Sequence, residues 1–364
     1  MKLRSIEEAN FENARVLVRV DFNVALNNSA EVEEHFRFDI VKKTVDHIAT
    51  FPGVKIALLT HFGRPSGEPR TTGQPQGESR AAEYSVAQIA SAAARSLGRK
   101  IVCVSDCIGA PVEEALGKLD SGEVLLLENV RLHPEEEAND PLFAETLAQP
   151  FTLFVNEAFS VCHRAHTSIV GVPKVLPAYA GFRVLEEIEK LDQVRLSPAH
   201  PAIAVIGGAK IETKLPLIRA FEENYDAILV GGKIANEALD EKIVFSEKVL
   251  LPRDFDSSER LDIGPITTAQ YIQVIKMAKT IVWNGPLGKF EEKPYDRGTL
   301  AILQAMLETD AFVVIGGGES LAVAEKANVM NKIGFVSSGG GAMLEYLSGH
   351  TLPGIEALKE ERSL

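Results

Sequence analysis

Short apolar runs rich in valine, isoleucine and leucine recur along the chain, and polar or glycine-rich residues follow each of them. In the first half the runs cover residues 16–20, 54–59, 124–127 and 151–155. In the second half they cover residues 202–206, 228–230, 280–283, 312–315 and 334–336. Apolar runs of this length are typical of buried parallel strands when helical patterns lie between them. The pattern predicts an α/β fold with doubly wound parallel sheets.

One amphipathic segment separates the two halves. Its apolar residues recur at helical spacing and are Val184, Ile188, Leu191 and Val194. The stretch S-P-A-H-P at residues 197–201 then ends the predicted helix. A chain of 364 residues is long enough for two domains. The helix is therefore a candidate connector between domains, although an ordinary covering helix would show the same stripe.

Charged and carboxamide side chains follow the predicted strands of the first half. The group comprises Asp21, Asn23, His61, Arg64, Arg131, Arg164 and His166, and Arg37 before a helical stretch can join it. Ligands of open α/β sheets bind beyond the carboxyl ends of the strands, where these side chains would meet. Arginine forks bind phosphate and carboxylate oxygens in pairs. One such arginine is usually a surface residue, but the whole group predicts a site for a small, multiply anionic molecule.

Glycine turns follow the predicted strands of the second half. The first turn, Gly207-Gly208, leads into a predicted helix with Lys210 and Lys214 on one face. Taken alone, this stretch fits a phosphate site and a tight turn with solvated lysines equally well. Further turns occur at residues 231–232, 285–288, 316–318 and 339–341. Because backbone amides at helix N-termini favour phosphate, the repeated turns predict a nucleotide site.

Composition excludes several classes of protein. A net charge of −13 argues against general nucleic-acid binding. No apolar run approaches the length of a membrane span, and the N-terminal residues lack the apolar core of a signal peptide, so we expect a cytoplasmic protein. The three cysteines, Cys103, Cys107 and Cys162, are too few for a disulfide framework, and we expect buried thiols. The C-x3-C spacing of Cys103 and Cys107 matches no established metal motif.

Common nucleotide and hydrolase motifs are missing from the sequence. There is no G-x-x-x-x-G-K-[ST], no G-x-G-x-x-G, no H-E-x-x-H and no G-x-S-x-G. These absences argue against a P-loop enzyme, a dinucleotide-dependent dehydrogenase, a zincin and an α/β-hydrolase. The stretch between Arg64 and Ala82 is rich in glycine, proline and polar residues, and we expect a surface loop without an assigned function.

The motifs occur in a specific order: R-V-D-F-N-V, T-H-F-G-R-P, L-L-L-E-N-V-R, V-N-E-A-F, H-R-A-H, G-G-A-K, L-D-I-G-P, V-W-N-G-P-L-G, G-G-G-E-S and S-G-G-G-A. From about residue 16 to residue 358, this order resembles phosphoglycerate kinase. The resemblance implies a phosphoglycerate-binding domain (1–177), a hinge helix (178–198) and a nucleotide-binding domain (199–344), with residues 345–364 packing back onto the first domain. It also implies reversible phosphoryl transfer between 1,3-bisphosphoglycerate and Mg-ADP, giving 3-phosphoglycerate and ATP.

The resemblance also assigns roles to individual residues. The substrate-binding positions that it implies are Asp21, Phe22, Asn23, Arg37, His61, Phe62, Gly63, Arg64, Arg131 and Arg164. The implied nucleotide-binding positions are Gly207, Gly208, Lys214, Gly231, Gly232, Glu291, Gly317, Gly318, Glu319 and Ser320. The implied catalytic residues are Arg37, Lys210, Lys214, Gly340 and Gly341, and the implied Mg²⁺ ligand is Glu319. Phosphoryl transfer needs positioning and charge stabilisation, so no general base is expected.

The sequence departs from the family at three places near the nucleotide. Glu319 stands where the family has aspartate, and Lys233 stands where it has a third glycine. Residues 238–261 are shorter than the family's equivalent. Smaller changes are Phe62, Glu157 and Ser160, which we expect to be tolerated.

Two other functions are weighed against the enzyme. A non-catalytic homologue that binds nucleotide or phosphoglycerate would be expected to have lost Arg37, Lys210 or Lys214, and all three are present. A dehydrogenase is a distant third and would bind NADH. The family resemblance further implies a monomer.

Overall fold

The computed structural model describes residues 2–27, 29, 31–32, 34–65 and 82–360. These residues form two compact units, and the division falls within the helix α8 (Phe182–Leu196). Unit 1 runs to Glu186 and takes in the chain again from Leu352, and unit 2 runs from Glu187 to Thr351. The expected domain boundaries stay predictions. The expected loop between Arg64 and Ala82 lies almost wholly outside the described residues.

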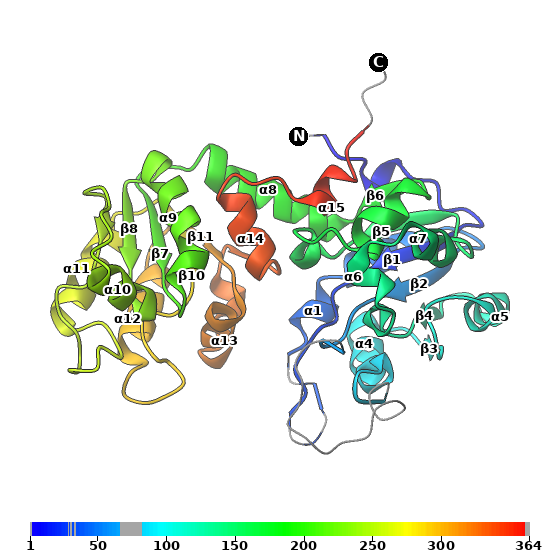
Figure 1. The fold of residues 1–364 in the computed structure, drawn as a ribbon, viewed down its shortest axis with the longest axis horizontal. Helices are drawn as coiled ribbons and strands as arrows, with labels where there is room; N and C mark the ends of the chain where they lie inside the picture. Colours follow the sequence, from blue (N-terminus) through cyan, green and yellow to red (C-terminus); the bar gives the residue numbers. More distant parts are fainter. Residues whose placement is uncertain (1, 28, 30, 33, 66–81, 361–364) are drawn as a thin grey trace. The chain divides into compact units, whose positions relative to one another are not determined.

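Unit 1 is built on a six-stranded parallel sheet in the order β3-β4-β2-β1-β5-β6, with helices beside it (Figure 1). The strands are β1 (Arg15–Arg19), β2 (Lys55–Leu59), β3 (Ile101–Cys103), β4 (Val124–Leu126), β5 (Leu153–Asn156) and β6 (Ala178–Ala180). The four predicted strands are present. β3 and β6 were not predicted, because each has three residues and lies at an edge of the sheet.

The helices of unit 1 are short. The α-helices are α1 (Phe36–Asp39), α2 (Lys42–Ile48), α4 (Ala90–Leu97), α5 (Ala110–Lys118), α6 (Glu135–Ala138), α7 (Pro141–Ala148) and α15 (Pro353–Glu356). The 3-10 and π turns are η1 (Ile6–Glu8), η2 (Val86–Gln88), η3 (Val130–Leu132), η4 (Phe159–Val161), η5 (Thr167–Gly171) and η6 (Val172–Lys174). Residues 352–358, with α15, belong to this unit, and Gly354 N donates to Cys162 O at 2.9 Å.

Unit 2 repeats the architecture with a parallel sheet in the order β12-β11-β10-β7-β8-β9 (Figure 1). Its strands are β7 (Ala202–Ile206), β8 (Ala227–Val230), β9 (Val249–Leu250), β10 (Thr280–Asn284), β11 (Phe312–Ile315) and β12 (Phe335–Val336). Its helices are α9 (Ile211–Asn224), α10 (Gly232–Asp240), α11 (Pro265–Ile275), α12 (Arg297–Leu307), α13 (Gly318–Lys326), η7 (Met330–Lys332) and α14 (Gly340–Leu347). The predicted α/β class with parallel sheets is confirmed.

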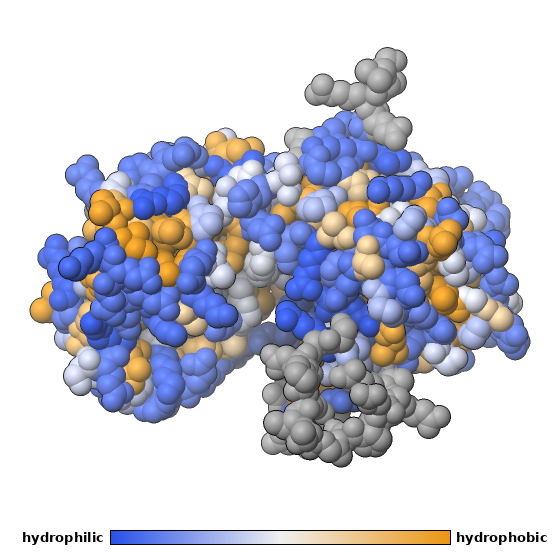
Figure 2. Space-filling view, viewed as in Figure 1, coloured by the Kyte–Doolittle hydropathy of each residue, from blue (hydrophilic) through white to orange (hydrophobic). Residues whose placement is uncertain are grey.

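The apolar positions that predicted these elements are the ones that are buried. All five residues of β7 are buried, and so is the stripe of α8 formed by Val184, Ile188, Leu191 and Val194. On the face shown in Figure 2, hydrophilic residues cover most of the surface. Among the described residues, no helix combines the length and the apolar character needed to cross a membrane. Cys107 and Cys162 are buried, but Cys103 is exposed at the end of an edge strand, so the prediction of buried thiols is wrong for Cys103.

Candidate active site

Asp21, just after β1, is the centre of a polar cluster in unit 1. Its carboxylate accepts hydrogen bonds from Arg37 Nη1 and Ser160 Oγ, and from Asn23 N at 3.1 Å. Burial by itself raises the pKa of Asp21, but Arg37, His61 and Ser160 outweigh it and hold the pKa below its usual value. Asp21 is therefore a fixed anion that orients Arg37, which lies on the short helix α1.

His61 follows β2 and is buried against charged groups. Nη2 of Arg19 lies 3.3 Å from its Nδ1, and the nearer oxygen of Asp21 lies 3.8 Å away. Burial lowers the pKa of His61 well below its usual value. The charge of Asp21 opposes this effect, and the cations Arg19, Arg131 and Arg164 act in the same direction as burial. His61 is therefore neutral near pH 7 and acts as a hydrogen-bonding group rather than a charge.

Arg131 and Arg164 lie close enough to Arg19 to repel it. Burial and then the charges of Arg164 and Arg19 lower the pKa of Arg131 to about 10. Arg131 Nη1 donates to Gly63 O at 3.0 Å, but its buried Nη2 has no hydrogen-bond partner among the described residues. Burial and the same arginines lower the pKa of His166 to about 4. A buried donor without a partner, inside a cluster of repelling cations, favours an anionic ligand.

The remaining predicted substrate residues support this cluster in different ways. Asn23 Oδ1 accepts from Gly63 N at 2.8 Å and so holds the turn after β2. The side chains of Phe22 and Phe62 are buried in the hydrophobic core of unit 1, which leaves their backbone as the part that can face a ligand. Arg64 is exposed and lies at the edge of the described residues.

In unit 2 the glycine turns pack against one another. A Cβ on Gly207 would lie 2.0 Å from Pro286 O, and a Cβ on Gly231 would lie 2.7 Å from a methyl carbon of Leu287. Gly208 N donates to Pro286 O at 3.0 Å, and Gly232 N donates to Leu287 O at 2.8 Å. From the sequence, these glycines were expected to let a ligand approach the backbone. In the structure, Gly207 and Gly231 are required because the turns after β7, β8 and β10 approach each other.

Lys214, on α9, lies beside the turns after β10 and β11. Its Nζ donates to Asn284 Oδ1, and Asn284 Nδ2 in turn donates to Gly316 O at 2.6 Å. Burial lowers the pKa of Lys214 to about 8, although the charge of Glu319 opposes this effect. A cavity of about 160 Å³ lies here, lined by Lys214, Asn284, Gly285, Gly317, Gly318, Glu319, Ser320, Gly340 and Leu344.

Lys210 does not lie on a helix face with Lys214. It has an extended backbone (φ −133°) and precedes α9, which begins at Ile211. The prediction that one helix carries both lysines is therefore wrong, because the turn after Gly208 extends for two more residues before the helix begins. Lys210 is exposed, whereas Lys214 is partly buried.

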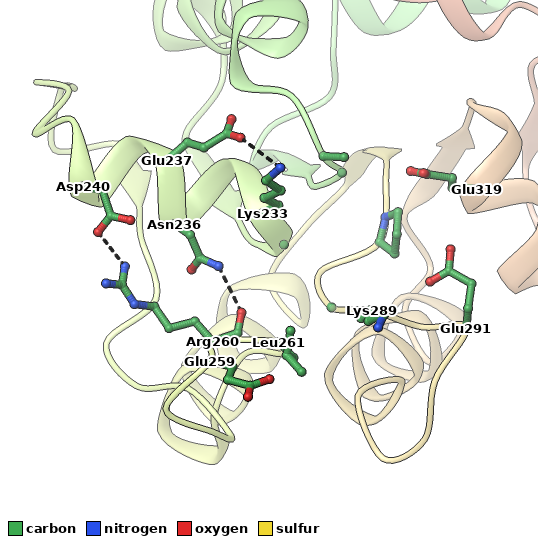
Figure 3. Close-up of a pocket in the computed structure, with 15 residues that line it drawn as sticks. Lys233, Asn236, Glu237, Asp240, Glu259, Arg260, Leu261, Lys289, Glu291 and Glu319 are labelled. Carbon is green, nitrogen blue, oxygen red and sulfur yellow. Dashed lines mark hydrogen bonds and ion pairs between the residues drawn. The ribbon is translucent and has the colours of Figure 1, made fainter.

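A larger cavity of about 480 Å³ lies between α10 and the turn after β10. Figure 3 shows Glu319 and Glu291 on one side of it, and Lys233, Asn236 and Glu237 from α10 on the other. Lys233 is well exposed and pairs with Glu237 at 3.8 Å. Asn236 Nδ2 donates to Arg260 O at 3.0 Å, while the buried Oδ1 of Asn236 has no partner among the described residues. An acceptor of this kind suits an amino group of a ligand.

Gly340 and Gly341 are the first two residues of α14. The turn before them is held by Glu187 of α8, which accepts from Ser337 Oγ at 2.7 Å and from Ser338 N at 2.6 Å. Gly340 also lines the small cavity with Lys214. The free amides of this helix N-terminus are therefore fixed at the cavity where phosphate oxygens would be stabilised.

Comparison with known proteins agrees with this arrangement. The family model for phosphoglycerate kinase matches residues 6–254 and 246–350. The chain belongs to the phosphoglycerate kinase family. Phosphoglycerate kinase of Moorella thermoacetica is 37% identical over 402 residues, covering 98% of this chain and 99% of its relative. That of Anaeromyxobacter dehalogenans is 36% identical over 406 residues, covering 99% and 100%.

Two solved structures are also similar. Phosphoglycerate kinase from Pyrococcus horikoshii superposes with a TM-score of 0.84 at 29% identity, covering 98% of both chains. The enzyme from Coxiella burnetii gives a TM-score of 0.78 at 29% identity, covering 98% of this chain and 99% of the other. The resemblance found in the sequence is confirmed, and the chain is an enzyme of the phosphoglycerate kinase family. The two parts of the family match overlap at residues 246–254. The overlap lies inside residues 238–261, the segment predicted to be shorter than its equivalent in the family.

The family implies Mg²⁺, and the residues at the small cavity fit that ion. Mg²⁺ is usually held by one or two carboxylates together with substrate phosphates. Glu319 offers an exposed carboxylate that lines the small cavity beside Lys214 and also the larger cavity beside α10. It is the second residue of α13 and lies near Lys214, so carboxylate and cation occupy the same end of the sheet.

Three residues with clear roles in this geometry were not assigned by the sequence analysis. Arg19 contacts His61, Asn284 contacts Lys214, and Glu187 holds the turn before α14. Asn284 carried a signal, because it follows a predicted strand directly in W-N-G-P. Arg19 and Glu187 carried none, since each lies inside a strand or helix pattern and contacts a segment far away in the sequence.

Proposed function

We propose that this chain transfers a phosphoryl group reversibly between 1,3-bisphosphoglycerate and Mg-ADP, giving 3-phosphoglycerate and ATP. The observation that carries the proposal is the buried Nη2 of Arg131, which has no hydrogen-bond partner among the described residues and lies near the cations Arg164 and Arg19. It occurs in a chain of the phosphoglycerate kinase family whose second unit has a cavity beside Lys214 and the N-terminus of α14.

The three-carbon substrate binds in unit 1 under this proposal. Its phosphate and carboxylate oxygens would receive hydrogen bonds from Arg37, Arg131 and Arg164. The negative charge of the substrate would also relieve the repulsion between Arg131, Arg164 and Arg19. His61 stays neutral and donates a single hydrogen bond. Asn23 and Gly63 fix the turn beside it, and Asp21 holds Arg37 in place.

The nucleotide binds in unit 2 under this proposal. Its base and ribose occupy the larger cavity, with Glu291 near the ribose, and its phosphates lie at the small cavity. Lys214 and the amides of Gly340 and Gly341 would donate to the phosphate oxygens. Glu319 would hold Mg²⁺, which neutralises phosphate charge when bound.

The phosphoryl transfer itself depends on stabilisation of the charge that develops on the transferring group. Arg37 and Lys210 would donate to the equatorial oxygens of the transferring group as their charge develops, with assistance from Lys214, Gly340 and Gly341. The attacking oxygen is already ionised on ADP, or on the carboxylate in the reverse direction, so no residue has to remove a proton. Asp21 and His61 fit this requirement, since neither changes its protonation state near pH 7.

We also propose that α8 acts as a hinge that brings the two substrates together. An acyl phosphate hydrolyses readily, so transfer benefits from a step that excludes water. Small-angle X-ray scattering with both substrates tests this step: an unchanged profile would contradict it. A cytoplasmic monomer is part of the same proposal, and sedimentation of the purified chain tests the oligomeric state.

An ATP-dependent assay with 3-phosphoglycerate, coupled to NADH oxidation by a dehydrogenase that consumes the acyl phosphate, tests the function. We expect turnover that requires Mg²⁺ and 3-phosphoglycerate together. Folded protein that binds both substrates without turnover would instead favour the non-catalytic homologue.

A further inference from the structure

Asp106, Cys107 and His133 form a compact group of metal-ligating side chains in unit 1. One carboxylate oxygen, Sγ and one ring nitrogen lie within 4.8 Å of one another. Within the described part of the chain, this is the one group of three or more such residues with that spacing. It lies outside every residue that the proposed reaction uses.

Two segments far apart in the sequence bring these residues together. Asp106 and Cys107 lie between β3 and α5, and His133 directly follows η3. Asp106 Oδ1 accepts from Cys107 N at 2.7 Å and lies 2.7 Å from His133 Nε2. The ring of His133 stacks on Phe143 with centroids 5.1 Å apart, which fixes its plane. The carboxylate of Asp106 and the ring of His133 are therefore held in place by contacts within the fold.

The group has an opening through which an ion can enter. Cys107 is 1% exposed and forms the base of the group. The side chains of Asp106 and His133 are 40% and 25% exposed and form its opening. A buried thiol with two accessible partners resembles the arrangement of an open site, in which a water molecule would complete the coordination.

The electrostatic surroundings favour a cation. The carboxylates of Asp106, Glu136 and Glu128 all lie close enough to Cys107 to interact with its side chain, so the group lies in a negative potential. This potential attracts a divalent cation, and a coordinated thiol loses its proton.

We propose that Asp106, Cys107 and His133 form a binding site for a thiophilic divalent cation of the zinc class. Oxygen, sulfur and imidazole nitrogen together match Zn²⁺ and its analogue Co²⁺ better than Mg²⁺, which prefers oxygen alone. Binding releases the Cys107 proton to solvent. It also requires His133 to carry its proton on Nδ1, so that Nε2 offers its lone pair.

Occupation of the site requires a small side-chain movement. Zinc–ligand distances of about 2.0–2.3 Å in a tetrahedron place neighbouring ligand atoms about 3.3–3.7 Å apart. The contact between His133 and Asp106 at 2.7 Å must therefore open, while Cys107 Sγ must approach. The ion would join the segment after β3 to the residue that follows η3, and η3 carries Arg131.

Titration of the reduced, full-length chain with Co²⁺ tests the proposal by absorption spectroscopy. A thiolate bound to Co²⁺ gives a near-ultraviolet charge-transfer band, whereas carboxylate and imidazole sites do not. We expect this band to saturate at one ion per chain and to disappear when Zn²⁺ is added. No band at saturating Co²⁺ would overturn the proposal and leave an ordinary hydrogen bond beside a buried thiol.

Variants assign the band to these residues. Cys107→Ser and His133→Gln should each abolish it or lower the Co²⁺ affinity at least tenfold. Cys103→Ser, which removes an exposed thiol four residues away, should leave it unchanged. Should Cys107→Ser fail to fold, His133→Gln carries the test, since that side chain is partly exposed. A band lost in Cys103→Ser, or kept with unchanged Co²⁺ affinity in His133→Gln, would contradict the assignment.

Thermal unfolding gives a second readout that does not depend on catalysis. A ligand that binds only the folded state raises the unfolding temperature, and the shift grows with the logarithm of its free concentration above the dissociation constant. Zn²⁺ should raise it for the unchanged chain and for Glu319→Gln, but not for His133→Gln. An equal shift in His133→Gln would place the ion elsewhere and overturn the site.

Discussion

The guanidinium of Arg19 reaches Nδ1 of His61 at 3.3 Å in the interior of unit 1. Because arginine has no acceptor, Nδ1 must be the acceptor, and the proton of the neutral ring lies on Nε2. Arg19 also donates to Ser168 Oγ at 2.8 Å and is 1% exposed. A residue in the core of β1 therefore sets the tautomer of a predicted substrate residue.

Replacing Arg19 should weaken substrate binding more than turnover. Arg19→Lys keeps a charge but cannot make the same set of contacts, so His61 loses its fixed tautomer. We expect the KM for 3-phosphoglycerate to rise about tenfold, equivalent to about 1.4 kcal/mol, with a smaller change in kcat. Steady-state kinetics measure the split, and nitrogen NMR of the His61 ring reports the tautomer. Arg15→Lys, an exposed arginine of the same strand, is the control. An unchanged tautomer in Arg19→Lys would contradict this role.

The activity should fall in alkaline solution as Lys214 loses its proton. Its pKa is lowered to about 8 by burial, and Glu319 opposes the shift. The protonated form that binds phosphate therefore disappears as the pH rises through about 8. The pH profile of kcat/KM for ATP reports this group in the free enzyme.

Two variants test whether Lys214 causes this loss of activity at alkaline pH, the alkaline limb of the pH profile. Glu319→Gln removes the carboxylate that favours the charged lysine, and should move the limb to lower pH. Lys214→Arg stays charged and should move it to higher pH. A limb that stays in place in Lys214→Arg would assign the titration to another group.

Glu157 should make unit 1 less stable as the pH rises from weakly acidic to weakly basic values. Burial raises its pKa from 4.5 to about 8, and its Oε2 has no hydrogen-bond partner among the described residues. Because the folded pKa lies above the unfolded value, the stability contribution is complete below pH 4.5 and is lost as the pH rises through about 8. The loss is on the order of 4 kcal/mol.

Glu157→Gln should remove this pH dependence. Its side chain keeps the oxygen that accepts from Thr44 Oγ1 at 2.7 Å and from Arg183 N at 3.0 Å. Urea unfolding at about pH 5.5 and about pH 8.5 measures the difference. Glu145→Gln, an exposed carboxylate on α7, should keep the pH dependence of the unchanged chain. The same change in the free energy of unfolding between the two pH values in both variants would contradict the role of Glu157.

Lys233 should have little influence on nucleotide binding. The sequence suggested that a long side chain in place of glycine would crowd the base, but 69% of the Lys233 side chain is exposed, and it pairs with Glu237. Exposed pairs of this kind contribute about 0–1 kcal/mol. Lys233→Ala should therefore change the KM for ATP by less than about fivefold. A larger decrease would show that the side chain obstructs the cavity.

The strands that could be predicted are those with continuous apolar runs. β7 and β11 have the predicted bounds. Both faces of each strand are covered, so the apolar run contains no polar residue. β3, β6 and β9 were not predicted, and each is a strand of two or three residues at an edge of its sheet. Their position is set by pairing with neighbouring strands, and that information is not local.

The residues of the candidate site also separate into those that the sequence predicts and those that it does not. Arg37, His61, Arg131 and Lys214 were identified because each follows a strand or turn within a recognisable motif. The contacts that tune them were not, because Arg19, Asn284 and Glu187 act across segments distant in the sequence. Glu157 was interpreted as a tolerable change, yet its burial makes it one of the most perturbed carboxyl groups.

The most direct test of the central claim is the turnover of 3-phosphoglycerate with Mg-ATP by Arg37→Ala and Lys210→Ala. Removing one preorganised donor from the transition state costs about 100-fold or more in kcat, and we predict this loss for each variant. Lys332→Ala, an exposed lysine of η7, should keep full activity. Turnover within about threefold of the unchanged chain in both Arg37→Ala and Lys210→Ala would contradict the proposed stabilisation of the transferring phosphoryl group.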